Sequence, residues 1–270
     1  MTRLREEIAG ATASLAEVGC DSPRLDAELL LGHVLGVNRA QLVLRGDEEA
    51  APDDRTRYLA LLTRRAKREP VAYILGRKDF RHLTLAVDPR VLIPRPETEL
   101  LVEVGLTLPS GVRVADIGTG SGAVALALKQ ERPDLDVVGV DVSSGALSVA
   151  RMNAQRLGLE VEWVQGDLLE GVSCDAVLAN LPYIADDELL PPEVALYEPR
   201  GALLGGRDGM DLVRRLIEQA GERPAISVVA LEIGHTQAPA TAALLEEAGF
   251  GQVERLRDLA GHQRVVVGRR

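Results

Sequence analysis

The sequence predicts an α/β fold: a seven-stranded sheet with an antiparallel last strand, preceded by a small helical N-terminal domain. Three observations predict it. From residue 111 onward, strand-like apolar runs alternate with helix-like runs, the pattern of a parallel sheet covered by helices on both faces. The first of these strands leads into a glycine-rich loop, DIGTGSGA, that opens a helix. Residues 1–75 instead have helical periodicity throughout.

The helical region contains at least two well-marked helices. Ser22 and Pro23 suit the N-cap and first position of the helix RLDAELLLGHVLG, and Gly36 suits its end. A second helix, PDDRTRYLALLTRRAKRE, begins with acidic residues and ends with basic ones, as the helix dipole favours. The basic residues Arg64, Arg65, Lys67 and Arg68 are candidates for RNA contact, but a charge run on a helix is usually a solvated face, which we expect here.

Residues 76–96 connect this domain to the next. The segment KDFRHLTLAVDPRVLIP alternates apolar and polar residues, which predicts a β-hairpin or an extended linker with a turn at Asp88-Pro89. A helix, ETELLVEVGLTL, follows. We therefore expect three parts: residues 1–75, the linker 76–96, and a main domain over 97–270.

The main domain is predicted to hold seven strands. Its strands are VRVADI, DVVGVD, VEWVQ, CDAVLAN, AISVVALEIG, QVERLRD and QRVVVGR. Helices separate most of them, including GAVALALKQ, GALSVARMNAQRLG, GMDLVRRLIEQAG and APATAALLEEAG. Only the short LAGH joins the last two strands, so we expect these to pair antiparallel, with the seventh inserted as an antiparallel partner.

Composition limits the class of protein. The net charge is −10, which argues mildly against nucleic acid as the main substrate, because phosphate binding needs cationic charge. Two distant cysteines, Cys20 and Cys174, indicate a reducing cytosol and no zinc site. We find no signal-peptide pattern and no apolar run long enough for a membrane span, so we expect a cytoplasmic protein. The four histidines have no metal-ligand spacing, and we expect no metal.

The glycine loop predicts a nucleoside cofactor. Glycines permit a sharp turn and the close approach of a ligand, and the helix N-terminus offers free N–H groups. The strand-end residue Asp141 follows Asp116 by 25 positions (141 − 116 = 25), where a carboxylate can accept both ribose hydroxyls. Loosely, the loop also fits a dinucleotide fingerprint.

Asp116 favours S-adenosylmethionine over a dinucleotide. Its carboxylate would repel a pyrophosphate, whereas it suits the amino group or sulfonium of S-adenosylmethionine. Asp167 ends the third strand, where an adenine amine can be held. The further cofactor contacts that we expect are Gly118, Thr119, Gly120, Ser121, Gly122, Val142, Leu168 and Asn180.

The tetrapeptide Asn180-Leu181-Pro182-Tyr183 leaves the fourth strand with no acid, base or histidine. With this motif and the glycine loop, the chain resembles the class I S-adenosylmethionine-dependent methyltransferases, whose fold is Rossmann-like. Among them it resembles the HemK/PrmC family, protein-(glutamine-N5) methyltransferases that modify peptide chain release factors. The similar blocks are RRAKREPVAYILG, VLIPRPETELLVE, DIGTGSGA, VDVS, EPRGALLGGRDGMDLVRRL, LEIGHTQ and DLAGHQRVVVG. IPRPETE (Ile93 to Glu99) is the more discriminating one, because related enzymes that act on a ribosomal protein usually diverge just after Pro-Arg.

The resemblance implies a reaction and a site. The methyl group of S-adenosylmethionine passes to the glutamine N5 in the Gly-Gly-Gln motif of a release factor, leaving S-adenosyl-L-homocysteine. In the family, the substrate amide is held by the Asn side-chain oxygen and the carbonyl of the next residue, here Asn180 and Leu181. Tyr183, after Pro182, offers a stacking face. The family usually has proline at the second position, so we expect Leu181 to act through its carbonyl rather than its side chain.

Other residues are expected around the substrate. We expect Arg95, Glu198 and Arg200 to contact it, since glycine-rich loops at the mouth of an α/β site usually bind substrate. Glu198 and Arg200 can equally anchor their loop to the body. Trp163 is expected in the core close to the site. The N-terminal domain would be a docking surface for the release factor.

Three alternative functions remain. The Asn-x-Pro-Tyr geometry also serves an adenine-N6 methyltransferase on DNA or RNA, although the charge disfavours it. A ribosomal-protein glutamine methyltransferase is a second alternative. The third is an inactive S-adenosylmethionine-binding assembly factor, which the intact Asn180, Pro182 and Tyr183 disfavour.

Overall fold

The structure is a computed structural model that describes residues 2–270. The chain divides into two compact units, which we describe separately. Unit 1 holds residues 2–76 and Leu190–Tyr197, and unit 2 holds Arg77–Leu189 and Glu198–Arg270. Segment 190–197, which we expected within the main domain, thus belongs to unit 1. Over residues 2–270, no helix combines the length and the apolar character that crossing a lipid bilayer requires.

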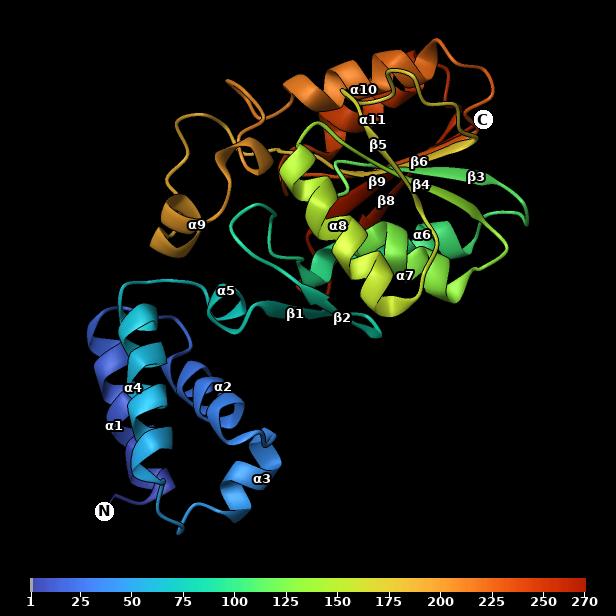
Figure 1. Ribbon diagram of the computed structural model, residues 1–270. Helices are drawn as coiled ribbons and strands as arrows, with labels where there is room; N and C mark the ends of the chain where they lie inside the picture. Colours follow the sequence, from blue (N-terminus) through green and yellow to red (C-terminus); the bar gives the residue numbers. More distant parts are fainter. Residues whose placement is uncertain (1) are drawn as a thin grey trace. The chain divides into compact units, whose positions relative to one another are not determined.

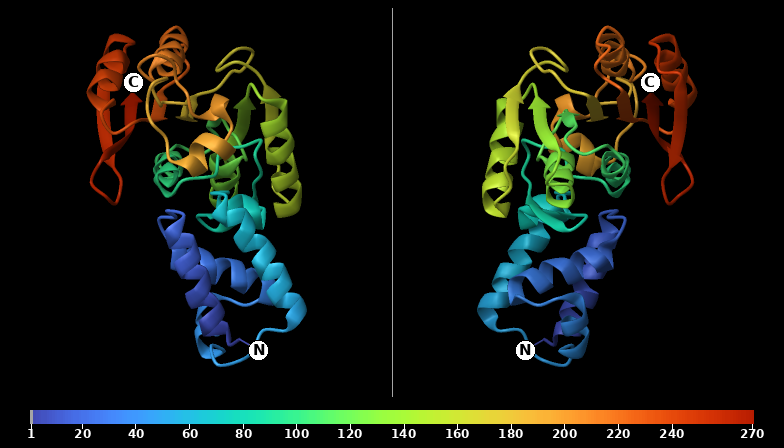
Figure 2. Two further views of the ribbon diagram at one scale, coloured as in Figure 1. Left: turned by 90° about the vertical axis from the view of Figure 1, so that its left-hand side faces the viewer. Right: turned by 90° about the vertical axis from the view of Figure 1, so that its right-hand side faces the viewer.

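Unit 1 is a helical bundle in which α1, α2 and α4 pack against one another (Figure 2). Its helices are α1 (Leu4–Glu17), α2 (Pro23–Leu35), α3 (Arg39–Leu44), α4 (Pro52–Ala66), α5 (Val71–Leu75) and α9 (Pro192–Tyr197). The expected ends of α2 are confirmed: Pro23 follows the N-cap residue Ser22, and Gly36 ends the helix with φ +65°. The Ser22 side chain makes no capping hydrogen bond, so the proline and the C-cap glycine mark this helix.

The basic run at the end of α4 is only in part the solvated face that we expected: Arg64 and Lys67 are exposed, whereas Arg65 is buried. Arg65 is 5 % exposed, and its guanidinium donates to Asp26 over 2.7 Å and to Glu193 over 3.0 Å. Arg68 donates to the same Glu193 over 2.7 Å. A buried guanidinium needs acceptors for its fixed fork of donors, and carboxylates on α2 and α9 supply them. For Arg65 and Arg68 the expectation was wrong because these acceptors lie far away in the sequence.

Unit 2 begins with a short antiparallel hairpin of β1 (Arg77–Phe80) and β2 (Leu83–Ala86). Its turn lies at Arg81 and His82. The turn predicted at Asp88-Pro89 is also present, beyond the hairpin, where the Val91 N–H donates to the Asp88 carbonyl over 3.1 Å. Arg81 has φ +50°, and its side chain pairs with Glu131 on one side and Glu103 on the other. These ion pairs hold the turn where no glycine marks it in the sequence.

The seven-stranded sheet has the order β5-β4-β3-β6-β7-β9-β8. Its strands are β3 (Arg113–Ile117), β4 (Asp136–Asp141), β5 (Glu162–Gln165), β6 (Ala176–Asn180), β7 (Val228–Glu232), β8 (Gln252–Arg257) and β9 (Gln263–Arg269). The first five are parallel, and β9 lies antiparallel between β7 and β8. The predicted fold class is confirmed, including the insertion of the last strand.

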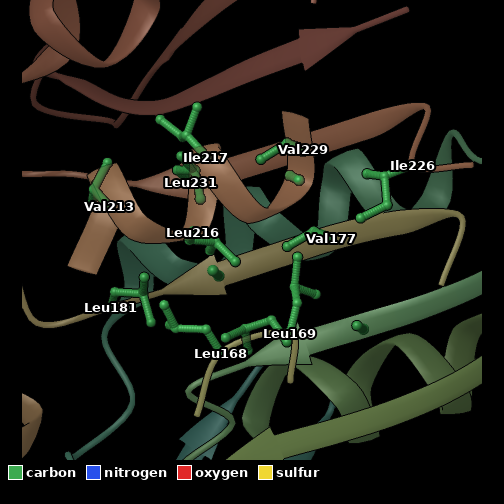
Figure 3. Close-up of a cluster of buried hydrophobic side chains, with 14 of the residues drawn as sticks. Leu168, Leu169, Val177, Leu181, Val213, Leu216, Ile217, Ile226, Val229 and Leu231 are labelled. Atoms are coloured by element: carbon green, nitrogen blue, oxygen red, sulfur yellow. The ribbon is translucent and has the colours of Figure 1, made fainter. Parts of the chain in front are cut away.

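Helices cover both faces of the sheet, with α6, α7 and α8 on one face and α10 and α11 on the other (Figure 1). The helices of unit 2 are η1 (Pro96–Thr98), α6 (Glu99–Leu106), α7 (Ala123–Glu131), α8 (Ser144–Leu157), η2 (Arg200–Ala202), α10 (Asp211–Gly221) and α11 (Ala238–Glu247). Alternate strand residues feed two separate cores: Leu178 faces the α6–α7 side, whereas Val177 faces the α10–α11 side (Figure 3). Because β3 to β7 run parallel, their carboxyl ends lie at one edge of this covered sheet.

Candidate functional site

A cavity of about 290 Å³ opens at the carboxyl ends of β3, β4 and β6. That edge is where open α/β sheets bind ligands, and the volume is near the lower end for a small-molecule site. Most of the predicted site residues line it: Asp116, Gly118, Thr119, Gly120, Ser121, Asp141, Val142, Asp167, Leu168, Asn180, Leu181 and Pro182. The lining does not include Gly122, Tyr183, Arg95, Glu198 or Arg200.

Asp116 forms hydrogen bonds that hold the glycine loop in place. One oxygen of this buried carboxyl accepts from the Thr119 hydroxyl over 2.6 Å and from the Ala125 N–H over 3.1 Å. Burial raises the pKa of Asp116 to about 6, while these two hydrogen bonds lower it. Gly118 and Gly120 have φ of +73° and +56°, which favours glycine. Asp116 therefore organises the loop, a role that is additional to the one we expected.

Asp141 joins the next strand to the same loop. Its two oxygens accept from the Gly120 N–H over 2.9 Å and from the Ser143 N–H over 2.8 Å. Burial raises the pKa of Asp141, which those backbone hydrogen bonds oppose. Val142, beside it, is 71 % exposed and lines the cavity. The cavity thus has a carboxylate next to an exposed apolar side chain.

Asp167 and Leu168 form the third strand-end position. The Asp167 carboxylate accepts from Arg215 over 2.7 Å, so a ligand amine would share this acceptor with a guanidinium. Leu168 is buried with φ +55°, a conformation that costs a non-glycine residue about 1–3 kcal/mol. Such strain is often retained where a backbone must face a ligand.

The Asn180 carboxamide is tied to two residues that sequence reasoning missed. Its Nδ2 donates to Thr98 Oγ1 over 3.0 Å, and the Thr98 hydroxyl donates to Glu232 over 2.6 Å. The Tyr183 hydroxyl points to the other Glu232 oxygen at 3.4 Å. Thr98 lies in the IPRPETE block, and Glu232 pairs with Asn180 in the register of β6 and β7. The signal was present as a strand-end acid in LEIG, but its partners lie far along the chain.

The backbone of the tetrapeptide rests on the glycine-rich segment 203–209. The Ile184 N–H donates to the Leu203 carbonyl over 3.0 Å, and Gln237 Nε2 donates to the Tyr183 carbonyl over 2.9 Å. A β-carbon on Gly205 would come within 3.0 Å of the Pro182 carbonyl oxygen. Residues 203–205 thus support the tetrapeptide; they overlap the loop Tyr197 to Gly206, for which substrate binding stays a prediction.

Leu181 contributes a buried side chain as well as a carbonyl. It is 4 % exposed and belongs to the same apolar cluster as Leu168 and Leu216 (Figure 3). A β-carbon on Gly118 would lie 3.3 Å from Leu181 Cδ2, so the side chain packs against the glycine loop. The side chain therefore has a packing role, while the predicted action of Leu181 through its carbonyl stays a prediction.

Arg95 and Glu198 pair with each other beside the site. The Glu198 carboxyl, 5 % exposed, accepts from the Arg95 guanidinium and, over 3.1 Å, from the Ile93 N–H. Of the two roles left open for Glu198, these contacts favour anchoring of the loop. Arg200 is exposed and opens η2.

Trp163 and Asn153 pack behind the glycine loop. A β-carbon on Gly122 or Gly139 would come within 3.0 Å of the Trp163 ring, so both positions need glycine. Buried Asn153 donates to the carbonyls of Ser121 and Ala86, each over 3.0 Å, and thereby links the loop to β2. Trp163 is half-buried and packs against the core, as expected.

Comparison with known proteins places the chain in a family. The models of the PrmC N-terminal domain and the methyltransferase small domain match residues 6–76 and 96–191. A release factor glutamine methyltransferase from Deinococcus radiodurans is 42 % identical over 276 residues, covering 99 % of each chain. One from Geobacter sulfurreducens is 41 % identical, covering 94 % of this chain and 92 % of its own.

A solved structure supports the fold. The Thermus thermophilus 16S rRNA N2 G1207 methyltransferase, whose structure holds AdoMet and guanosine, superposes with a TM-score of 0.52 at 18 % identity. The match covers 72 % of this chain and 49 % of that one. The two proteins share the fold of the sheet in unit 2, but their sequences are not closely related. The nearly full-length sequence matches carry more: this chain is a methyltransferase and belongs to the family of release factor glutamine methyltransferases.

Proposed function

We propose that this protein methylates the side-chain N5 of the glutamine in the Gly-Gly-Gln motif of peptide chain release factors, with S-adenosyl-L-methionine as donor and S-adenosyl-L-homocysteine as product. The observation that carries the proposal is the Asn180 carboxamide at the cavity. Its Nδ2 is engaged by Thr98, which leaves Oδ1 as an acceptor for a substrate N–H. The names of the relatives supply the substrate class.

The lining of the cavity fits the proposed cofactor. Asp141 would hold the ribose hydroxyls, the exposed Val142 would contact the base, and the backbone of Gly118 to Ser121 would hold the polar tail. Asp116 favours a cationic ligand at that loop. When bound, S-adenosylmethionine supplies a methyl group already activated on a sulfonium.

The chain itself contributes orientation. An amide nitrogen is a poor nucleophile because its lone pair is delocalised into the carbonyl. The Asn180 side-chain oxygen and the Leu181 carbonyl can accept both N–H groups of the substrate amide and thereby direct the nitrogen. Positioning of this kind supplies up to roughly 7–11 kcal/mol of a barrier. The amide loses its proton after the methyl transfer has made the nitrogen cationic, so no base is needed within the tetrapeptide before the transfer.

The substrate protein also needs a docking surface, which we assign to unit 1. Residues 6–76 match the PrmC N-terminal domain, and the net charge of −10 disfavours nucleic acid as substrate. A flexible loop that enters a concave site gains affinity from a second contact elsewhere, which supports a docking role for this domain.

The test is a labelling assay. The protein is incubated with methyl-labelled S-adenosylmethionine and, separately, with release factor, ribosomal protein or nucleic acid. We expect label on the release factor and none on a release factor whose motif glutamine is changed to alanine. Asn180→Ala should lower turnover by about 10²-fold or more while cofactor binding by titration persists. Label on nucleic acid alone, or full activity of the variant, would contradict the proposal.

A further inference from the structure

Three side chains from distant parts of unit 2 form a hydrogen-bonded chain beside the cavity. Asn180 comes from the end of β6, Thr98 from η1 and Glu232 from the end of β7. Thr98 is 4 % exposed and Glu232 is 1 % exposed, so water does not compete for these bonds. Asn180 and Thr98 both line the cavity, whereas Glu232 does not and contacts Thr98 from behind.

The hydrogen-bond chain has a direction. An ionised carboxylate only accepts, so the Thr98 hydroxyl must donate its one proton to Glu232. The lone pairs of Thr98 Oγ1 then accept from Asn180 Nδ2. A carboxamide has its donor and its acceptor on opposite sides, so fixing Nδ2 fixes Oδ1 as well.

We propose that Glu232, acting through Thr98, is a positioning residue that holds the Asn180 carboxamide with its oxygen toward the substrate amide. The identity of that amide rests on the function proposed above, whereas the orientation of Asn180 does not. Glu232 does not touch the substrate. Its role is to keep an acceptor, and not an NH2 donor, facing a substrate group that itself only donates.

Protonation of Glu232 allows these hydrogen bonds to reverse their direction. Glu232 becomes neutral by taking a proton from solvent. Its O–H can then donate to Thr98 Oγ1, and the Thr98 hydroxyl is free to donate to Asn180. Asn180 would then turn its Oδ1 to Thr98 and present Nδ2 to the substrate amide. Two donors would face each other, so the site would lose its hold on the amide.

The surroundings of Glu232 bring this reversal near neutral pH. Burial raises its pKa to about 7; the Thr98 hydrogen bond, Arg264 on β9 and the Tyr183 hydroxyl lower it, and Glu97 in η1 raises it. These groups come from the elements that face the carboxyl. The orientation of Asn180 should therefore depend on pH near neutrality.

The first test separates positioning from folding. Thr98→Val removes the hydroxyl at nearly constant volume, and we expect kcat for release factor methylation to fall by about 10²-fold. The affinity for S-adenosylmethionine should stay unchanged, and Thr98→Ser should restore kcat. Thr107→Val, at the other end of α6, is the matched control because its hydroxyl bonds only to the local Val104 carbonyl and weakly to Arg269. Retained kcat in Thr98→Val would overturn the proposal.

The second test needs no substrate. The side-chain amide NMR signals of Asn180 should shift with a midpoint near the Glu232 pKa of about 7 in the wild-type protein, and stay constant in Glu232→Gln. In the activity assay, the fall in kcat on acidification through the same pH should disappear in Glu232→Gln. Asn180 signals that do not titrate, or that titrate equally in the variant, would overturn the inference. A wild-type protein that fails to methylate release factor would instead refute the proposed function, and the NMR result would still decide the inference.

Discussion

Gly209 lies directly against the backbone carbonyl of Tyr183. A β-carbon on Gly209 would come within 3.0 Å of that oxygen, and Gly209 has φ +74°. The same carbonyl accepts from Gln237 Nε2 over 2.9 Å. The position of the tetrapeptide thus depends on a residue 26 positions further along the chain (209 − 183 = 26) that has no side chain of its own.

Gly209→Ala should therefore damage the site and the fold together. The added methyl group must displace the Tyr183 carbonyl, and alanine is strained at this φ, so we expect a loss of about 1–3 kcal/mol in unfolding free energy and a lower kcat. Urea unfolding and methylation rates check this. Gly251→Ala is the control, because a β-carbon there meets no atom within 4 Å. Equal behaviour of the two variants would show that the contact does not matter.

Leu181→Ala should lower the free energy of unfolding more than Leu189→Ala does, because only Leu181 is buried. The Leu181 side chain fills the cluster between the glycine loop and α10, and truncation of a buried leucine costs about 2–5 kcal/mol. The Leu181 carbonyl remains, so turnover of the folded protein should fall less than in Asn180→Ala. Leu189→Ala, at a side chain 97 % exposed, should change stability by no more than about 0.5 kcal/mol. Denaturant midpoints measure both.

Asp141→Ala should weaken S-adenosylmethionine binding. The carboxylate holds two backbone N–H groups at the cavity and is proposed to accept the ribose hydroxyls. A hydrogen bond to a charged group contributes about 1.5–3 kcal/mol, so we expect an affinity loss of roughly 10- to 100-fold by calorimetry. Asp136→Ala, at the opposite end of the same strand, should bind as the wild type does. Unchanged affinity of the Asp141 variant would remove it from the proposed cofactor site.

Glu232 should make the protein less stable as the pH rises. Its pKa is raised from 4.5 to about 7 by burial, so between these values the folded state binds more protons than the unfolded state. Unfolding free energy then falls with rising pH, and the loss is complete above the folded pKa. The total loss of unfolding free energy is a few kcal/mol, since one pKa unit corresponds to about 1.4 kcal/mol.

Glu232→Gln removes this dependence. The gain of the variant over the wild type should grow from about pH 4.5 to about pH 7 and then level off. Urea unfolding at a series of pH values measures the difference in unfolding free energy between the two proteins. The contribution of Asp116 to the pH dependence cancels in this difference because both proteins contain it. Glu254→Gln, on the exposed β8, is the control. A pH-independent difference between wild type and Glu232→Gln would contradict the raised pKa.

Much of the fold was predictable because its signals are local. Apolar runs and turn residues predicted the seven strands, and the short LAGH predicted the antiparallel pair β8 and β9. The hairpin turn at Arg81 and His82 was missed, because Arg81 adopts its left-handed conformation beside ion pairs with Glu103 and Glu131 and no typical turn residue marks the place. The burial of Arg65 was missed for the same reason, since its acceptors lie on other helices.

The sequence by itself determined the fold class, the glycine loop and the strand-end positions of Asp116, Asp141 and Asn180. It could do so because the carboxyl ends of parallel strands meet at one edge, so order along the chain sets neighbourhood in space. Only the tertiary structure decided what fixes the Asn180 carboxamide. Thr98 and Glu232 reach it from 82 and 52 positions away (180 − 98 = 82; 232 − 180 = 52), and the raised pKa of Glu232 arises from burial, which no stretch of sequence contains.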